Sequence, residues 1–251
     1  MPKVKPSQAE SYLCTPIRLD TEATYYVTGF KPNATKMTAH HMLIYGCEEP
    51  GMNQIQLLDI NRMKSIDITQ KKHMVNLDQT SDRHNHNICM QTISIIVLHP
   101  IIMLFIPGAD VATWNCGEMA AAIEPDMEQH PVCGPGSQSQ IIYAWAMDAP
   151  GLQLPEGVGF RVGGDTNIKY LVLQVHYAST DYIDADGDDS GVILQYTEQQ
   201  QPKTAGVLLL GTGGSAPAHS TTFFETSCDI EDPRTIHPFA FRTHTHSLGI
   251  F

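Results

Sequence analysis

Short runs of β-branched and aromatic residues, separated by glycine and proline, make up most of the hydrophobic pattern of this chain. The 19 glycines and 16 prolines fall between these runs, which is typical of a β-sandwich rather than a helix bundle. The pattern therefore predicts an all-β fold. Strands are expected in residues 11–47, where two or three fit, and at Gln140–Met147, Pro155–Gly164, Lys169–Tyr177 and Phe239–His246.

The hydrophobic pattern changes between residues 52 and 110. Asn53–Asn87 is polar and irregular, and Ile88–Gly108 then runs for 21 residues without a charge, which is long enough to cross a bilayer. Four residues unsuited to a bilayer core interrupt this run, namely Gln91, His99, Pro100 and Pro107. We therefore expect an atypical insertion that is buried or poorly folded, and any membrane contact would be confined to Ile88–Gly108.

The chain is acidic, with 15 basic against 27 acidic side chains and a formal net charge of -12. It has no stripe of lysine and arginine, which binding to nucleic-acid phosphates requires, so we expect no nucleic-acid partner. With 251 residues, the chain is long enough for one large β-domain or two smaller ones. Gln199–Pro202 resembles a linker, and we place the domain boundary there, between residues 1–199 and 200–251.

Six cysteines are widely spaced along the chain, and none belongs to a CxxC pair. This spacing disfavours a zinc ribbon or a thioredoxin-type site, and in an all-β chain it favours disulfides formed in an oxidising compartment. Asn33-Ala34-Thr35 is a glycosylation sequon, which agrees with secretion. The chain has no apolar signal region at its start, so we expect a secretion signal upstream of Met1.

Five histidines are candidate metal ligands, because imidazole is the commonest protein ligand of transition metals. His244 and His246 are two apart on an expected strand, so both can point to one face and bind one ion. The adjacent His40 and His41 would point to opposite faces, and they can share an ion only at a strand end or bulge. His176, from another strand, would then be a third ligand. Each group alone also fits a surface or core histidine, but together they predict two incomplete metal shells.

Several sequence blocks surround these histidines. They are Met1-Pro2, Tyr12-Leu-Cys14, Phe30-Lys-Pro32, His40-His-Met-Leu43, Tyr45-Gly-Cys47, Tyr143-Ala-Trp-Ala146, Leu154–Gly164, Leu173-Gln-Val-His-Tyr177 and Phe241-Arg-Thr-His-Thr-His246. In this order, the blocks resemble the copper type II, ascorbate-dependent monooxygenases, and among these the peptidylglycine α-hydroxylating monooxygenases. The resemblance covers residues 1–51 and 111–249.

This resemblance implies two antiparallel, jelly-roll-like β-sandwich domains with one copper ion on each. It implies that the protein hydroxylates the α-carbon of the C-terminal glycine of a peptide, with molecular oxygen and with ascorbate as the reductant. His40, His41 and His176 would hold the copper that relays electrons. His244 and His246 would be catalytic, as ligands of the copper at which oxygen binds.

The resemblance also implies roles for other residues. Arg242, two residues before His244, would pair with the carboxylate of a glycine-extended peptide, because guanidinium is a planar bidentate donor. Gln174, two residues before His176, would orient substrate or water. The implied disulfides are Cys14–Cys116 and Cys47–Cys133.

The chain departs from the family pattern in three respects, one of which is that the partner expected for Cys228 and most of the second sandwich are missing from it. Residues 52–110 have no counterpart in that pattern, and we interpret them as an insertion such as a translated intron. The family's second copper also needs a methionine from a later strand, and none of the 11 methionines lies at the matching position. We therefore expect the second domain to be truncated and the activity to be impaired.

Two alternatives to a peptide hydroxylase stay open. One is a related copper hydroxylase that acts on an amine, similar to dopamine β-monooxygenase. The other is a non-catalytic, secreted copper-binding protein. Arg242 favours a peptide carboxylate over an amine as the substrate group.

Overall fold

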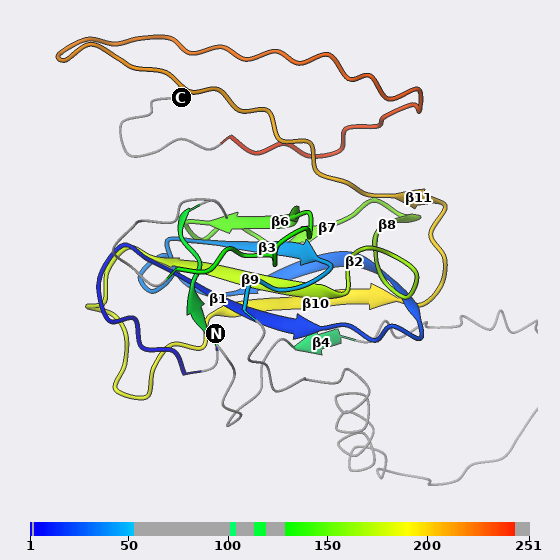
Figure 1. Ribbon diagram of the computed structural model, residues 1–251, viewed down its shortest axis with the longest axis horizontal. Helices are drawn as coiled ribbons and strands as arrows, with labels where there is room; N and C mark the ends of the chain where they lie inside the picture. Colours follow the sequence, from blue (N-terminus) through cyan, green and yellow to red (C-terminus); the bar gives the residue numbers. More distant parts are fainter. Residues whose placement is uncertain (2, 53–100, 104–112, 119–128, 244–251) are drawn as a thin grey trace, which may run out of the picture. The chain divides into compact units, whose positions relative to one another are not determined.

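The computed structural model of the chain describes residues 1, 3–52, 101–103, 113–118 and 129–243, and Figure 1 shows its ribbon. The chain divides into two compact units, Met1–Gly206 and Val207–Phe251. Some of the residues singled out from the sequence lie outside the described ones. These are His244, His246 and most of the segment from residue 52 to residue 110.

The described residues contain eleven β-strands and no α-helix, which confirms the all-β fold. In chain order the strands are β1 (Ser11–Arg18), β2 (Thr24–Asn33), β3 (His41–Cys47), β4 (Ile101–Met103), β5 (Trp114–Asn115), β6 (Gln140–Ala146), β7 (Leu152–Gln153), β8 (Val158–Gly163), β9 (Tyr170–Tyr177), β10 (Gly191–Thr197) and β11 (Lys203–Thr204).

Two sheets form the unit Met1–Gly206 (Figure 1). The first has five strands in the order β5-β1-β9-β3-β6, and its neighbours run antiparallel. The second has six strands, in the order β11-β8-β2-β10-β4 with β7 paired to β2. Its pairs are antiparallel apart from β8 with β11. Neighbouring strands are far apart in sequence, so the first sheet brings together residues from both ends of this unit.

The central strand β9 has a different environment on each face. Leu173 and Val175 pack in the core together with residues of the second sheet, such as Phe160. Gln174 and His176 point to the opposite face, because successive side chains of a strand alternate. The core therefore lies between the two sheets, as in a β-sandwich, and the other face of β9 carries the polar residues.

Most of the strand predictions are confirmed. Residues 11–47 contain three strands, and β6, β8 and β9 lie inside the ranges expected from the sequence. The strand predicted at Phe239–His246 is wrong over Phe239–Thr243, which is not part of a strand. A strand depends on a neighbour that hydrogen-bonds to its backbone, and none of the described residues is paired with this stretch. The local sequence pattern of this stretch is therefore not enough to make it a strand.

Part of the segment interpreted as an insertion is paired with the second sheet. β4 runs antiparallel to β10, with Ile102 opposite Leu194. Of the residues that the structure describes, none belongs to a helix long and apolar enough to span a membrane. The rest of Ile88–Gly108, the one expected membrane contact, lies outside the described residues.

The position of Leu173 gives a test of the sandwich. Leu173→Ala is expected to lower the free energy of unfolding by about 2–5 kcal/mol, because truncating a buried leucine leaves a cavity in the core. Urea denaturation followed by circular dichroism measures the change. Lys31→Ala, at an exposed position of β2, is the control and should change this free energy by less than about 0.5 kcal/mol. Equal effects of the two substitutions would contradict the assignment of Leu173 to the core.

Candidate metal centre

Three histidines meet at one end of the first sheet. His41 is the first residue of β3 and is paired in register with His176, near the end of β9. His40 lies in the bend just before β3, and its backbone N–H donates to the carbonyl of His176 at 2.9 Å. Because His40 precedes the pleated strand, its side chain is not forced to the face opposite that of His41. This is the strand-end position that two adjacent ligands require.

The three imidazoles converge through their Nδ1 atoms. The Nδ1 atom of His41 lies 3.4 Å from that of His40 and 3.3 Å from that of His176. One ligand atom from each of the three rings lies within 4.8 Å of the others. Three nitrogens bound at about 2.0 Å to one metal in a trigonal plane are about 3.5 Å apart, so the spacing fits a single ion. No other group of three or more such ligands occurs in the described part of the chain.

Burial keeps His176 in the form that binds metals. The residue is 5% exposed, whereas His40 and His41 are more open to solvent. Loss of water lowers the pKa of His176 below its ordinary value, and this outweighs the opposing effect of the Glu10 carboxylate. His176 is therefore neutral near pH 7, with one ring nitrogen available to a metal.

Tyr12 and Glu10 surround the His176 ring. Tyr12 is its register partner on β1, and the two rings stack with centroids 4.2 Å apart and planes inclined by 3°. Glu10, just before β1, accepts a hydrogen bond from His176 Nε2 at 2.8 Å. Burial, with the Glu118 and Glu10 carboxylates, raises the pKa of Tyr12 to about 12, so its phenol stays protonated. Neither residue can be identified from the sequence, because both contacts depend on the pairing of β1 with β9.

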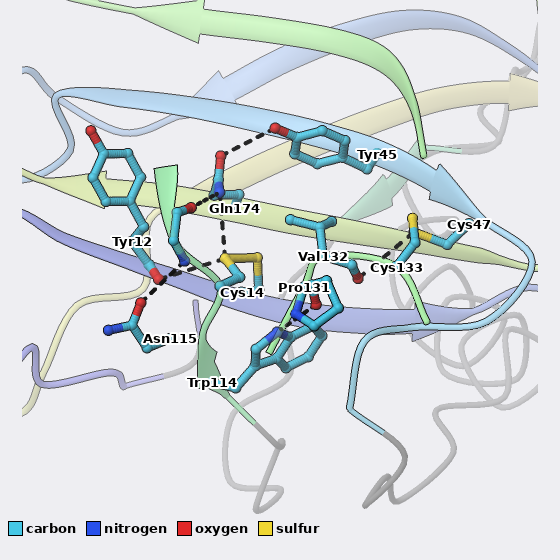
Figure 2. Close-up of a disulfide and its surroundings, with 12 residues drawn as sticks. Tyr12, Cys14, Tyr45, Cys47, Trp114, Asn115, Pro131, Val132, Cys133 and Gln174 are labelled. Atoms are coloured by element: carbon cyan, nitrogen blue, oxygen red, sulfur yellow. Dashed lines mark hydrogen bonds between the residues drawn. A yellow bond between two sulfur atoms is a disulfide. The ribbon is translucent and has the colours of Figure 1, made fainter. Parts of the chain in front are cut away.

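Gln174 is buried beside a disulfide on the same face of β9 (Figure 2). Its amide nitrogen donates to the Gly117 carbonyl at 2.8 Å and lies 3.4 Å from Cys116 Sγ. Its amide oxygen accepts from the Tyr45 hydroxyl at 3.4 Å. The sequence suggests that Gln174 orients substrate or water. In the structure its side chain is fully buried and links β9 to the segment that follows β5.

Two disulfides cross-link this side of the first sheet. Cys14 of β1 is bonded to Cys116, and Cys47 at the end of β3 is bonded to Cys133. These are the pairs that the family resemblance implied. They connect residues separated by 102 and 86 positions, and each such bond stabilises a fold by about 2–4 kcal/mol. The disulfides therefore fix the loops around the strands that carry the histidines (Figure 2).

The other residues singled out from the sequence belong to the unit Val207–Phe251. Arg242 is exposed, and His244 and His246 lie outside the described residues. The grouping of these three residues in one site therefore stays a prediction.

The fold and the site together define a class: an antiparallel, disulfide-linked β-sandwich with a three-histidine metal centre. Residues 1–59 and 57–184 match the N-terminal domain of the copper type II ascorbate-dependent monooxygenases. Residues 203–250 match the C-terminal domain of the same enzymes. The chain belongs to the copper type II ascorbate-dependent monooxygenase family.

Individual relatives agree with this assignment. The chain is 31% identical to peptidyl-glycine alpha-amidating monooxygenase A of Xenopus laevis, over 99% of this chain and 19% of the relative. It is 29% identical to the peptidyl-glycine alpha-amidating monooxygenase of Mus musculus, over 99% of this chain and 18% of the relative. It is 32% identical to human dopamine beta-hydroxylase, over 43% of this chain and 19% of the relative. The chain thus spans about a fifth of the length of these curated relatives.

The buried amide of Gln174 gives a test of its structural role. Gln174→Leu is expected to lower the free energy of unfolding by about 1–3 kcal/mol, because it leaves the Gly117 carbonyl and the Tyr45 hydroxyl buried without these partners. Gln153→Leu is a matched control, since Gln153 also donates to a backbone carbonyl, at 2.9 Å, but is exposed. Water can replace that bond, so the control should be nearly neutral. Thermal and urea denaturation measure the stability of both variants. Equal stabilities of Gln174→Leu and Gln153→Leu would contradict the role of Gln174 in linking β9 to the segment after β5.

Proposed function

We propose that this chain forms part of an enzyme that hydroxylates the α-carbon of a C-terminal glycine in peptides, using molecular oxygen and ascorbate. Family membership supports copper and monooxygenase chemistry, and the peptide substrate is our inference. The observation that carries the proposal is the convergence of His40, His41 and His176 on one point with spacings that suit a single copper ion.

His40, His41 and His176 would hold the copper ion proposed for electron transfer. Three neutral imidazoles suit copper in both oxidation states, whereas zinc, a common occupant of histidine sites, cannot cycle electrons. Bound copper would supply one-electron chemistry. The protein holds the rings in place through the pairing of β3 with β9 and through the stacking of Tyr12 on His176.

His244 and His246 are the proposed ligands of the second copper, which would supply the oxygen chemistry needed to hydroxylate the glycine α-carbon. Their spacing supports this, because side chains two residues apart on an extended backbone point the same way. Arg242 would bind the terminal carboxylate of the peptide, since guanidinium and carboxylate form two parallel hydrogen bonds.

Two observations favour a peptide over an amine as the substrate. The match to the peptidyl-glycine alpha-amidating monooxygenase of Xenopus laevis runs over 99% of the chain, whereas the match to human dopamine beta-hydroxylase covers 43%. In addition, Arg242 offers a cation that suits a carboxylate and would repel an ammonium group.

The proposed compartment is the secretory lumen or the extracellular space. The two disulfides require oxidising conditions to form and persist. Asn33 of the glycosylation sequon is exposed at the end of β2, and Thr35 is exposed as well, so the sequon is accessible to modification.

Copper titration tests the three-histidine site. His41→Ala and His176→Ala are each expected to reduce bound copper by about one equivalent, because two imidazoles bind far more weakly than three. Equilibrium dialysis with metal analysis measures the stoichiometry, and circular dichroism verifies the fold. His219→Ala, which removes an exposed histidine of the other unit, should leave the stoichiometry unchanged. Unchanged copper binding in the first two variants would contradict the proposed site.

Substrate class is tested by ascorbate-driven oxygen uptake. A glycine-extended peptide is expected to stimulate uptake more than an arylalkyl amine does. Arg242→Gln should raise the KM for the peptide about 10–100-fold, because a charge-assisted hydrogen bond contributes about 1.5–3 kcal/mol. Arg234→Gln is the control, since Arg234 is an exposed arginine of the same unit that is paired with Asp232. A preference for the amine would indicate an amine hydroxylase, and copper binding without any uptake would indicate a non-catalytic copper protein.

A further inference from the structure

We propose that Glu10 is a positioning residue of the three-histidine site. Its carboxylate accepts the Nε2–H of His176 and thereby directs the Nδ1 lone pair of that ring toward His40 and His41. The inference deepens the proposed function and rests on it, because it concerns how the chain prepares His176 to bind copper.

The two nitrogens of His176 have different partners. Nε2 lies 2.8 Å from a carboxylate oxygen of Glu10, and Nδ1 lies 3.3 Å from Nδ1 of His41. A neutral imidazole carries one N–H, and an ionised carboxylate can only accept. The hydrogen atom is therefore held on Nε2, and the lone pair of Nδ1 faces the other two histidines. A carboxylate that holds a metal-binding histidine in this way also increases the basicity of the ligating nitrogen.

The backbone around Glu10 supports this role. Glu10 directly precedes β1 and has a φ of 54°, in the left-handed region that non-glycine residues seldom adopt. Two residues later, Tyr12 stacks flat on the His176 ring. The hydrogen bond acts in the plane of the ring, and the stacking acts on its face. Together they restrict both rotations of the side chain, so Nδ1 is aimed before any metal binds.

An ordinary surface ion pair is the competing interpretation of the Glu10–His176 contact. It requires a protonated imidazole, whose Nδ1–H would then point at the Nδ1 atom of His41, 3.3 Å away. The Glu10 side chain is 70% exposed and that of His176 only 7%, so an ion pair here would add little to stability. The contact therefore acts mainly through its direction, and its main consequence is the choice of tautomer.

The tautomer of His176 in the copper-free chain is the direct test. ¹⁵N NMR of histidine-labelled protein distinguishes the two ring nitrogens, and His176→Gln assigns the signals. The wild-type chain should show the Nε2–H tautomer. Glu10→Ala should produce a mixture of tautomers. Glu10→Gln should retain more of the wild-type form than Glu10→Ala does, because its amide oxygen can still accept from Nε2–H, although its NH₂ group can also donate to the other tautomer. Glu156→Ala, an exposed glutamate between β7 and β8, is the control and should have no effect.

Copper affinity gives a second readout. In a full-length background with His244→Ala and His246→Ala, Glu10→Ala is expected to weaken binding at the three-histidine site about tenfold, at the low end of what loss of such a carboxylate costs. Glu10→Gln should weaken binding less, and Glu156→Ala should not weaken it. A wild-type tautomer and affinity in Glu10→Ala would overturn the role of Glu10. If the wild-type chain bound no copper at this site, the proposed function would fail, whereas the NMR result would still decide the tautomer.

Discussion

The pairing of β9 with β1 on one side and with β3 on the other is the constraint on which the candidate site depends. It places His176 opposite Tyr12 in one ladder and opposite His41 in the other. A shift of either ladder by one residue would send these partners to the opposite face, because strand side chains alternate. The core resists such a shift, since it would remove Leu173 from the interior. Burial of apolar residues on one face of β9 thereby fixes the geometry of the histidines on the other.

The polar face of β9 is covered by cross-linked loops instead of by the second sheet. Gln174 bonds to Gly117, next to the cysteine that is joined to Cys14. A buried amide with all its hydrogen bonds formed favours a single arrangement of the loop. A buried amide that lacked a partner would destabilise the fold. The loop after β5 is therefore held against the sheet by one covalent bond and by directional hydrogen bonds (Figure 2). This support brings Glu118 into the electrostatic environment of Tyr12 and His176.

The sequence predicts the strands of this fold better than it predicts their partners. The range of β9 follows from a local run of apolar residues, and so does that of β6. The residue types and strand positions suggested His176 as a third ligand beside His40 and His41, and the resemblance to copper monooxygenases gave that group its role. The spacing of the three rings could not be predicted, because the register of β3 against β9 is not a local property. Glu10 and Tyr12 were missed for the same reason. The strand expected at Phe239–His246 shows the converse over its described part, Phe239–Thr243, since a strand-like pattern without a paired neighbour does not form a strand.

The exposure of Glu10 is as important to its proposed role as its distance from His176. A carboxylate buried beside an imidazole would be costly to desolvate, and it would favour the protonated ring that cannot bind metal. At 70% exposure, Glu10 keeps most of its hydration and its attraction for a proton on the ring is weakened by solvent. The burial of His176 then prevails and leaves the ring neutral. The hydrogen bond depends on direction and short range, so it survives this screening. An exposed acceptor can therefore orient a buried ligand without protonating it.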